Sequence, residues 1–169
     1  MARRAISWRP IALGAGVAAA LGLIFLAAQR RTALIGDSYA VGLGPELKKL
    51  VPNFQYEGHV GSSTSQWASG AYGGWLFWYR PSVVLVSLGV NDGPAPNTQN
   101  YRKIISWLTS MGAKVIWIQP PANVSTSAHD VISTLSVETV PAQTLPLAPD
   151  GLHPTSYGAW AQVVAKAIS

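Results

Sequence analysis

Polar residues that could form a reactive site follow two apolar segments and recur near the C-terminus. Asp37 and Ser38 come directly after one apolar segment, and Asn91 follows another. His153 comes three residues after Asp150. A serine becomes a nucleophile when a base takes its proton, and imidazole changes charge near neutral pH. A carboxylate can orient that imidazole through its second nitrogen. These residue types predict acyl transfer by Ser38, with His153 as the base and Asp150 as its orienting partner.

Acyl transfer also requires hydrogen-bond donors for the negative oxygen of the tetrahedral intermediate. The candidates are the backbone N–H groups of Ser38 and Gly61 and the side-chain amide of Asn91. A substrate can approach Gly61 closely because this residue has no Cβ. A different interpretation of residues 32–45 alone is structural, since Asp and Ser are common N-caps of helices.

The elements that must position these residues follow from the hydrophobic pattern. Apolar and β-branched segments alternate with segments of helical periodicity, which predicts a parallel sheet with right-handed crossovers. The carboxyl ends of such strands meet at one edge, where open α/β folds place their sites. The expected strands are 32–36, 54–60, 82–89 and 113–120. The expected helices are 38–51, 97–111 and 153–169, with shorter helical pieces within 63–79 and 128–138.

Four stretches, in this order and at these distances, resemble the SGNH hydrolases, also called the GDSL esterase/lipase family. They read GDS at 36–38, GSST at 61–64, GVND at 89–92 and DGLH at 150–153. The resemblance covers about residues 32–169. It implies a three-layer α/β/α sandwich with a mainly parallel, flavodoxin-like sheet. The site that it implies is a triad of Ser38, Asp150 and His153, with an oxyanion hole of Ser38, Gly61 and Asn91.

The chain departs from the family pattern at two places. Tyr39 stands where the family often has leucine, which bears on packing or substrate fit more than on chemistry. The second stretch matches loosely, so Gly58 remains a rival to Gly61 for the second oxyanion donor.

The charge of the chain argues against a nucleic-acid partner. The sequence has 12 basic and 7 acidic side chains, a net charge of +5. Without a basic excess, a domain has little to attract a phosphate backbone. From residue 32 onward the charges balance, so we expect no nucleic-acid binding. The excess comes from Arg3, Arg4, Arg9, Arg30 and Arg31.

The chain contains no cysteine, which excludes disulfides and thiolate metal sites. Only one of its three histidines, His153, lies in a plausible site, so we expect neither a metal nor a cofactor. His59, at a strand end, is a weaker candidate for a substrate contact, and His129 is expected to be solvated. Asp92 is expected to fix its loop rather than to act as an acid or base. An aromatic run is expected mainly to pack in the core, with sugar stacking or membrane contact as alternatives. It comprises Trp67, Tyr72, Trp75, Trp78 and Tyr79.

Residues 1–31 are predicted to form a membrane anchor ahead of a single domain at 32–169. Residues 11–28 carry no charge and would span about 27 Å as a helix, enough for the core of a bilayer. The arginines before this segment favour a cytoplasmic N-terminus and an exported domain, periplasmic or extracellular. A cleaved signal peptide is the alternative, although Leu26 before Ala28 makes a poor cleavage site.

These observations together predict a serine esterase that removes a short acyl group, such as acetyl, from an envelope or extracellular glycan. One alternative is a lysophospholipase or thioesterase, with the aromatic run holding a longer acyl chain. An alternative of another class is a catalytically idle module of the same fold that binds a surface partner.

Overall fold

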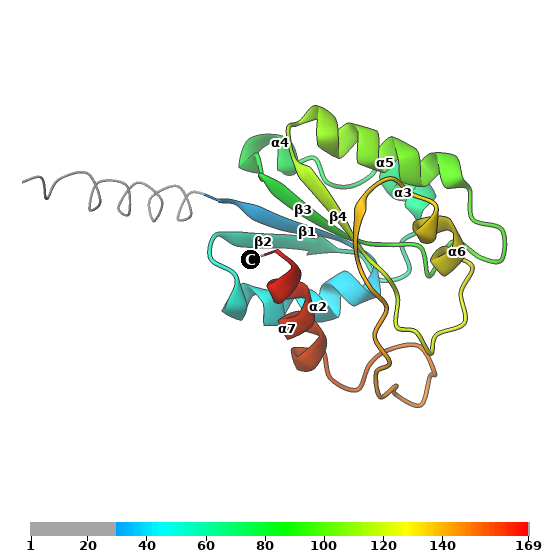
Figure 1. Cartoon of the computed structure of the whole chain (residues 1–169). Coiled ribbons are helices and arrows are strands. Elements are labelled where there is room, and N and C mark those ends of the chain that lie inside the picture. The colour runs from blue at the N-terminus through cyan, green and yellow to red at the C-terminus, as the bar shows by residue number, and fades with distance from the viewer. Residues whose placement is uncertain (1–29, 169) are drawn as a thin grey trace, which may run out of the picture.

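The computed structural model describes residues 30–168, which form a parallel five-stranded sheet between two layers of helices (Figure 1). The strand order is β2-β1-β3-β4-β5, and every neighbouring pair is parallel. The predicted α/β fold with a parallel sheet is therefore confirmed. The strands are β1 (Thr32–Gly36), β2 (Phe54–Gly58), β3 (Val83–Ser87), β4 (Lys114–Ile118) and β5 (Glu138–Val140).

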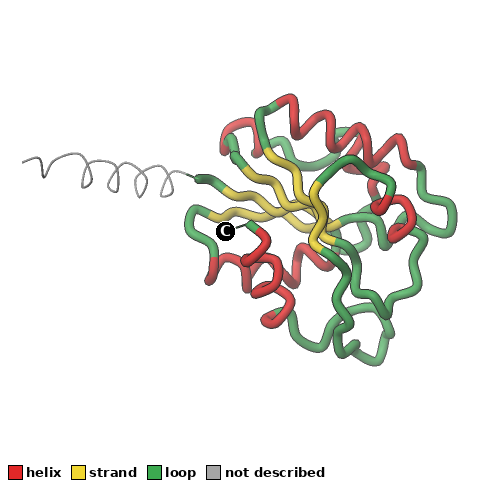
Figure 2. The backbone as a smooth tube through the Cα atoms, viewed as in Figure 1, coloured by secondary structure: helices red, strands yellow, loops and turns green. Residues whose placement is uncertain are grey.

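Helices cover both faces of the sheet (Figure 2). One face packs against α2 and α7, and the other packs against α3 and α5. The alternation of side chains along β1 divides the two cores, because Leu34 belongs to the first and Ile35 to the second. The helices are α2 (Ser38–Leu50), α3 (Thr64–Ala68), α4 (Leu76–Tyr79), α5 (Thr98–Ser110), α6 (Ala128–Ser133) and α7 (Gly158–Ala167).

At Gly36, the last residue of β1, the backbone of β3 approaches closely. A Cβ at Gly36 would lie 2.1 Å from the carbonyl oxygen of Ser87, which no other residue could tolerate. The next amide, that of Asp37, donates to the same carbonyl at 3.0 Å. Glycine at 36 therefore lets β1 pair tightly with β3 up to the point where Asp37 and Ser38 emerge.

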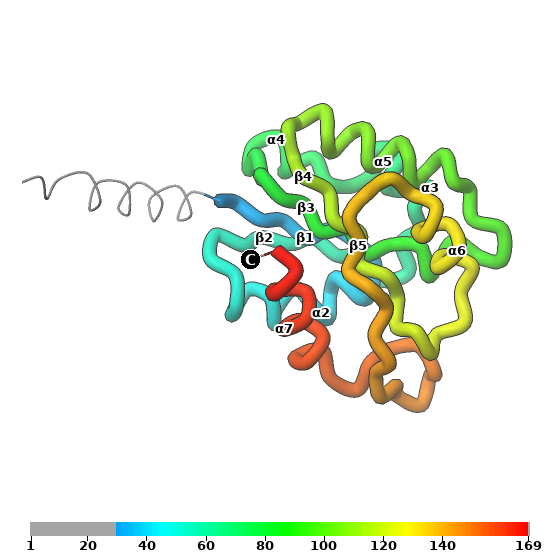
Figure 3. The backbone as a smooth tube through the Cα atoms, viewed as in Figure 1, coloured from blue at the N-terminus to red at the C-terminus, as the bar shows by residue number. Residues whose placement is uncertain are grey.

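Two segments differ from the sequence-based expectation. The helix expected over 128–138 ends at Ser133, and the chain then forms the edge strand β5, which pairs only with β4 (Figure 3). Three residues are too short to show a strand pattern. The last helix begins at Gly158 and not at residue 153, because Pro154 forms a bridge with Leu147 instead.

The predicted anchor at 11–28 lies outside the described residues. Within residues 30–168, none of the helices combines the length and the apolar character that crossing a bilayer would require.

Candidate active site

Ser38 is the first residue of α2, directly beyond the carboxyl end of β1. Asp37 is the N-cap of this helix, and its Oδ1 accepts the backbone N–H of Tyr39 at 3.0 Å. The capping interpretation and the chemical one are therefore compatible, because Asp37 caps the helix and Ser38 is left for another role. Ser38 is 8% exposed.

The structure brings Ser38, His153 and Asp150 into one chain of hydrogen bonds, although 115 positions separate the serine from the histidine. Nε2 of His153 lies 2.9 Å from Oγ of Ser38, and Nδ1 lies 2.7 Å from Oδ2 of Asp150. When Nδ1 carries the proton and donates it to Asp150, Nε2 is free to accept the proton of Ser38. This is the geometry that a nucleophilic serine requires.

The carboxylate of Asp150 is held by the turn that connects it to His153. Its Oδ1 accepts the backbone N–H groups of Leu152 at 2.9 Å and His153 at 3.0 Å. The hydrogen bond from His153, followed by those from the backbone, lowers the pKa of Asp150 to about 2. Asp150 is therefore ionised near neutral pH and can stabilise a positive charge on His153.

Tyr39 connects the start of α2 to the loop that carries the histidine. Its hydroxyl donates to the carbonyl oxygen of Leu152 at 3.0 Å, and its ring meets the His153 ring edge-on at a centroid distance of 6.0 Å. The ring also packs on Trp160 of α7. The hydroxyl of Tyr39 therefore adds a hydrogen bond, which a leucine could not make, that fixes the loop next to His153.

The three expected oxyanion donors lie on neighbouring segments. The N–H of Ser38 is at the first position of α2, where a helix supplies no acceptor. Gly61 has φ +76°, and nothing lies within 4 Å of where its Cβ would be. Asn91 donates one amide hydrogen to the carbonyl oxygen of Ser62 at 3.1 Å, so its second amide hydrogen is available. This bond joins the Asn91 loop to the Gly61 loop.

Gly58, the rival of Gly61, serves a packing role at the end of β2. A Cβ at this position would lie 2.7 Å from the backbone nitrogen of Val41 in α2. The close approach of α2 to β2 requires a glycine here, whereas the open surroundings of Gly61 leave room for a substrate.

A polar network supports the two loops, and most of its members were not predicted from the sequence. Asp92 accepts from Thr64 through both its backbone N–H, at 2.8 Å, and its hydroxyl, at 2.6 Å. Asp92 therefore fixes its loop, as expected. The hydroxyl of Ser62 accepts the indole N–H of Trp67 at 3.0 Å and donates to the carbonyl of Gly36. Ser62 and Thr64 are buried. Their importance could not be recognised from the residue types alone, because serine and threonine are usually exposed.

Asp37 is the most unusual ionisable group near the site. Its side chain is fully buried, and among the described residues none bonds to its Oδ2. Burial is the main cause that raises the pKa of Asp37 to about 8, although the N–H of Tyr39 opposes the shift. The Asp37 carboxyl is therefore largely neutral at pH 7 and adds no negative charge beside Ser38.

The remaining histidines lie away from the triad's hydrogen bonds. Nε2 of His59 lies 2.8 Å from a carboxylate oxygen of Glu57, and its ring stacks on Tyr72 at 3.9 Å. His129 lies in α6. The aromatic run divides between two environments, because Trp67 is 1% exposed and Trp78 is 80% exposed. The expectation of core packing therefore holds for Trp67 but not for Trp78.

Across residues 30–168, no three or more His, Asp or Glu side chains gather closely enough to hold a metal ion.

Comparison with known proteins shows the fold. Neither a family model nor a curated protein matches the chain. A putative acylhydrolase from Bacteroides fragilis superposes with a TM-score of 0.60 and 18% identity, covering 83% of this chain and 86% of that one. A carbohydrate esterase family 3 structure from Talaromyces cellulolyticus gives 0.55 and 18%, covering 83% and 94%. The C-terminal catalytic domain of peptidoglycan O-acetyltransferase A from Streptococcus pneumoniae gives 0.55 and 18%, covering 82% and 90%. The described domain therefore has the SGNH hydrolase fold.

Proposed function

We propose that this protein is a serine ester hydrolase that uses Ser38, His153 and Asp150 as its triad. The observation that carries the proposal is the continuous hydrogen-bond chain from Asp150 through His153 to Oγ of Ser38. A buried structural network would not need an imidazole placed between a carboxylate and a serine at the open edge of a sheet. That edge is where α/β folds bind their ligands.

The first half of the reaction forms an acyl-enzyme. Nε2 of His153 takes the proton of Ser38 while Oγ attacks the ester carbonyl carbon. The N–H groups of Ser38 and Gly61 and the amide of Asn91 donate to the oxyanion that results. The protonated His153 then gives its proton to the leaving alkoxide oxygen, the ester C–O bond breaks, and an alcohol departs.

The second half returns the enzyme to its starting state. A water molecule attacks the acyl carbon and gives its proton to Nε2 of His153. The same donors hold the second oxyanion. The bond between Oγ of Ser38 and the acyl carbon breaks, Oγ regains its proton from His153, and the carboxylic acid leaves. Asp150 stays ionised throughout and stabilises the imidazolium in both halves.

The substrate class that we propose is a glycan carrying a short acyl group such as acetyl. Two structures that share the fold are named as a carbohydrate esterase and a peptidoglycan O-acetyltransferase, which supports an acylated glycan. The predicted anchor at 11–28 and the arginines before it support an exported domain next to the cell envelope. Hydrolysis of longer acyl chains remains the alternative that the same triad could perform.

The test combines labelling with a substrate series. A fluorophosphonate probe is expected to label Ser38 and no other serine. The purified protein is expected to hydrolyse p-nitrophenyl acetate faster than longer p-nitrophenyl esters, and Ser38→Ala is expected to abolish both signals. Ser156→Ala is the matched control, because it removes an exposed serine from the loop that carries His153.

Three outcomes would contradict the proposal in different ways. Labelling of another serine, or an active Ser38→Ala variant, would refute the triad. A preference for long esters would replace the acetylated glycan by a lipid-like substrate. A folded protein that is neither labelled nor active would favour the idle surface-binding module.

A further inference from the structure

Two large aromatic side chains are exposed at the end of the domain where the strands begin. Trp78 is 80% exposed and Phe77 is 58% exposed, and their rings meet edge-on at 5.1 Å in α4. Three residues separate the end of α4 at Tyr79 from the start of β3 at Val83, so α4 lies at the start of the sheet rather than at the edge with Ser38 (Figure 1). Large exposed aromatics of this kind mark contact surfaces.

The same end of the domain is where the chain enters from residues 1–29. Arg31 fixes this entry point to α4, because its guanidinium donates to the carbonyl of Tyr79 at 2.8 Å and lies over the Tyr79 ring at 5.8 Å. The carbonyl of Arg31 also accepts the N–H of Ser82 at 2.9 Å. The exposed aromatics therefore lie beside the point from which the apolar segment 11–28 continues along the chain.

Basic side chains gather at this end of the domain. Two acidic residues lie there, Glu46 and Glu138, and each is paired, with Lys49 at 2.7 Å and Lys114 at 2.5 Å. Among the described basic residues, only Arg102 and Lys103 in α5 lie elsewhere. The basic residues at the start of the sheet and at the helix ends beside it are Arg30, Arg31, Lys48, Lys49, Arg80, Lys114 and Lys166.

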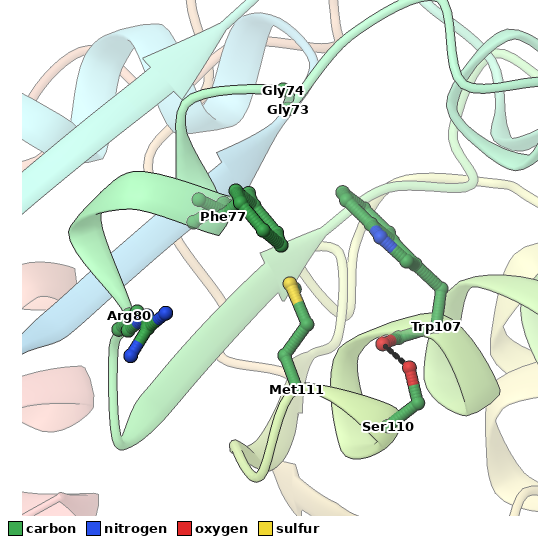
Figure 4. A pocket seen from close by; sticks show the side chains of 8 residues that line it. Gly73, Gly74, Phe77, Arg80, Trp107, Ser110 and Met111 are labelled. Carbon is green, nitrogen blue, oxygen red and sulfur yellow. Dashed lines mark hydrogen bonds between the residues drawn. The ribbon is translucent and has the colours of Figure 1, made fainter.

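Two hollows open at the same end. One of about 530 Å³ lies between α4 and the end of α5, where Phe77, Trp107 and Met111 face a common space with Arg80 near its rim (Figure 4). The other, of about 320 Å³, is lined by Arg30, Leu50 and residues at the end of α7. Both combine apolar walls with an arginine, which suits amphiphilic molecules with an anionic head.

We propose that this end of the domain, the basal surface formed by Arg30, Arg31, Phe77, Trp78 and Arg80, rests on a bilayer that contains anionic lipids. Trp and Phe rings lie at the boundary between headgroups and acyl chains, and arginines near them attract anionic headgroups. The bilayer is the occupant because the apolar segment 11–28 would enter it directly beside these residues.

The orientation has a consequence for the substrate. Ser38 lies at the opposite edge of the sheet, beyond a five-residue strand that spans about 16 Å. With the basal surface on the membrane, the triad faces away from it. The site then takes acyl groups from molecules that project into the envelope and not from lipids in the same bilayer. This part rests on the proposed function and favours a glycan.

The test uses the full chain reconstituted in vesicles and exploits the absence of cysteine. Trp78→Cys is labelled with an environment-sensitive nitrobenzoxadiazole dye, and Ala95→Cys, exposed in the loop after β3 at the opposite edge, is the matched control. The vesicles contain phosphatidylcholine with or without phosphatidylglycerol, and a lipid with a nitroxide near its headgroup serves as the quencher. We expect quenching several-fold stronger at residue 78 than at residue 95. We also expect it to increase with phosphatidylglycerol.

A charge variant tests the basic residues separately. Arg80→Gln is expected to reduce the quenching at residue 78 in the anionic vesicles about twofold or more. Arg102→Gln, which removes an exposed arginine of α5, is expected to leave it unchanged. The readout does not depend on hydrolysis, so failure of the proposed activity would not affect it.

The proposal is overturned if the dye at residue 78 remains as accessible to water as the dye at residue 95. It is also overturned if the dye is shielded without being quenched by the nitroxide lipid, because a second copy or the segment 11–28 would then cover the surface. Equal quenching at both positions would refute the orientation.

Discussion

The two ends of the sheet carry opposite kinds of residues. At the carboxyl end of the strands lie the acids Asp37, Asp92 and Asp150, a histidine and a serine. Short hydrogen bonds join Asp150 to His153 and His153 to Ser38. At the other end lie basic side chains, some of them paired with acids, and the exposed rings of Phe77 and Trp78. The domain from residue 32 onward is neutral as a whole, yet its charges are separated in space.

This difference shows what an overall charge can conceal. The net charge of residues 32–169 is close to zero, which argued against a basic surface. That argument holds for the net charge but not for the places where the charged side chains lie. The carboxyl end depends on positions fixed to within a hydrogen-bond length, so single substitutions there have large effects. The opposite end depends on the summed attraction of several side chains, so each of them contributes little.

The largest expected effect comes from removing the base at the carboxyl end. His153→Ala is expected to lower kcat for a small soluble ester by about 10⁴-fold, because Ser38 then has no acceptor for its proton. His129→Ala, in α6, is the matched control and is expected to leave the rate unchanged. Steady-state kinetics with a p-nitrophenyl ester measure both variants. An active His153→Ala variant would show that His153 is not the base.

Next in size is the loss of one oxyanion donor. Asn91→Ala is expected to lower kcat by about 10²- to 10³-fold with little change in KM, since the second amide hydrogen would donate to the oxyanion and not to the ground-state substrate. A rise in KM without a fall in kcat would instead assign Asn91 to ground-state binding. Asn97→Ala, which removes the N-cap of α5, controls for the loss of an amide side chain from the same connection.

The sequence was sufficient to predict the parallel sheet and its central strands. Long apolar β-branched segments, such as 82–89, predict strands that are buried on both faces of a sheet. The structure confirms this for β3, in which every residue is buried. The proposed triad was identified from residue types and from the stretches that resemble the SGNH hydrolases. The structure places His153 within hydrogen-bond distance of both Ser38 and Asp150.

Other features could not be read from the sequence, for identifiable physical reasons. The edge strand β5 has three residues and pairs on one side only, so its pattern is too short to recognise. Ser62 and Thr64 act through burial, which the side-chain type does not reveal. Trp67 is buried and Trp78 is exposed. This difference in exposure depends on how the short helices α3 and α4 pack against the rest of the domain, which the sequence pattern does not reveal.

A third prediction concerns Asp37, whose burial raises its pKa from 3.8 to about 8. The unfolded chain releases this proton near pH 4, whereas the folded chain holds it until about pH 8. The free energy of unfolding is therefore expected to fall as pH rises between these values, by about 1 kcal/mol per pH unit for one proton. Asp37→Asn, which keeps an N-cap oxygen, is expected to flatten this dependence.

Chemical denaturation at several pH values would measure the effect. Asp130→Asn, a change in α6 on the opposite face of the sheet from α2, is the matched control and is expected to leave the pH dependence as it is. An unchanged dependence in Asp37→Asn would mean that this carboxyl is not the group that binds the extra proton.

A smaller effect is expected at Tyr39, which holds the histidine loop. Tyr39→Phe removes only the hydroxyl that donates to the carbonyl of Leu152. We expect a loss of about 1 kcal/mol in the free energy of unfolding and a few-fold decrease in kcat, because the loop with His153 is less firmly placed. Tyr56→Phe, at an exposed position of β2, is the control for loss of a hydroxyl. Identical kinetics in both variants would show that the bond does not position the histidine.

The smallest expected effect separates the two tryptophans of the aromatic run. Trp78 is 80% exposed, so Trp78→Ser is expected to change the free energy of unfolding by less than about 0.5 kcal/mol. Trp67 is 1% exposed and its indole N–H donates to Ser62, so even Trp67→Phe leaves a buried hydroxyl with one partner fewer. A loss of about 1 kcal/mol or more is expected there. Denaturation of the full chain in one detergent measures both variants. A large loss for Trp78→Ser would mean that this ring stabilises the fold and is not held at the surface for a partner.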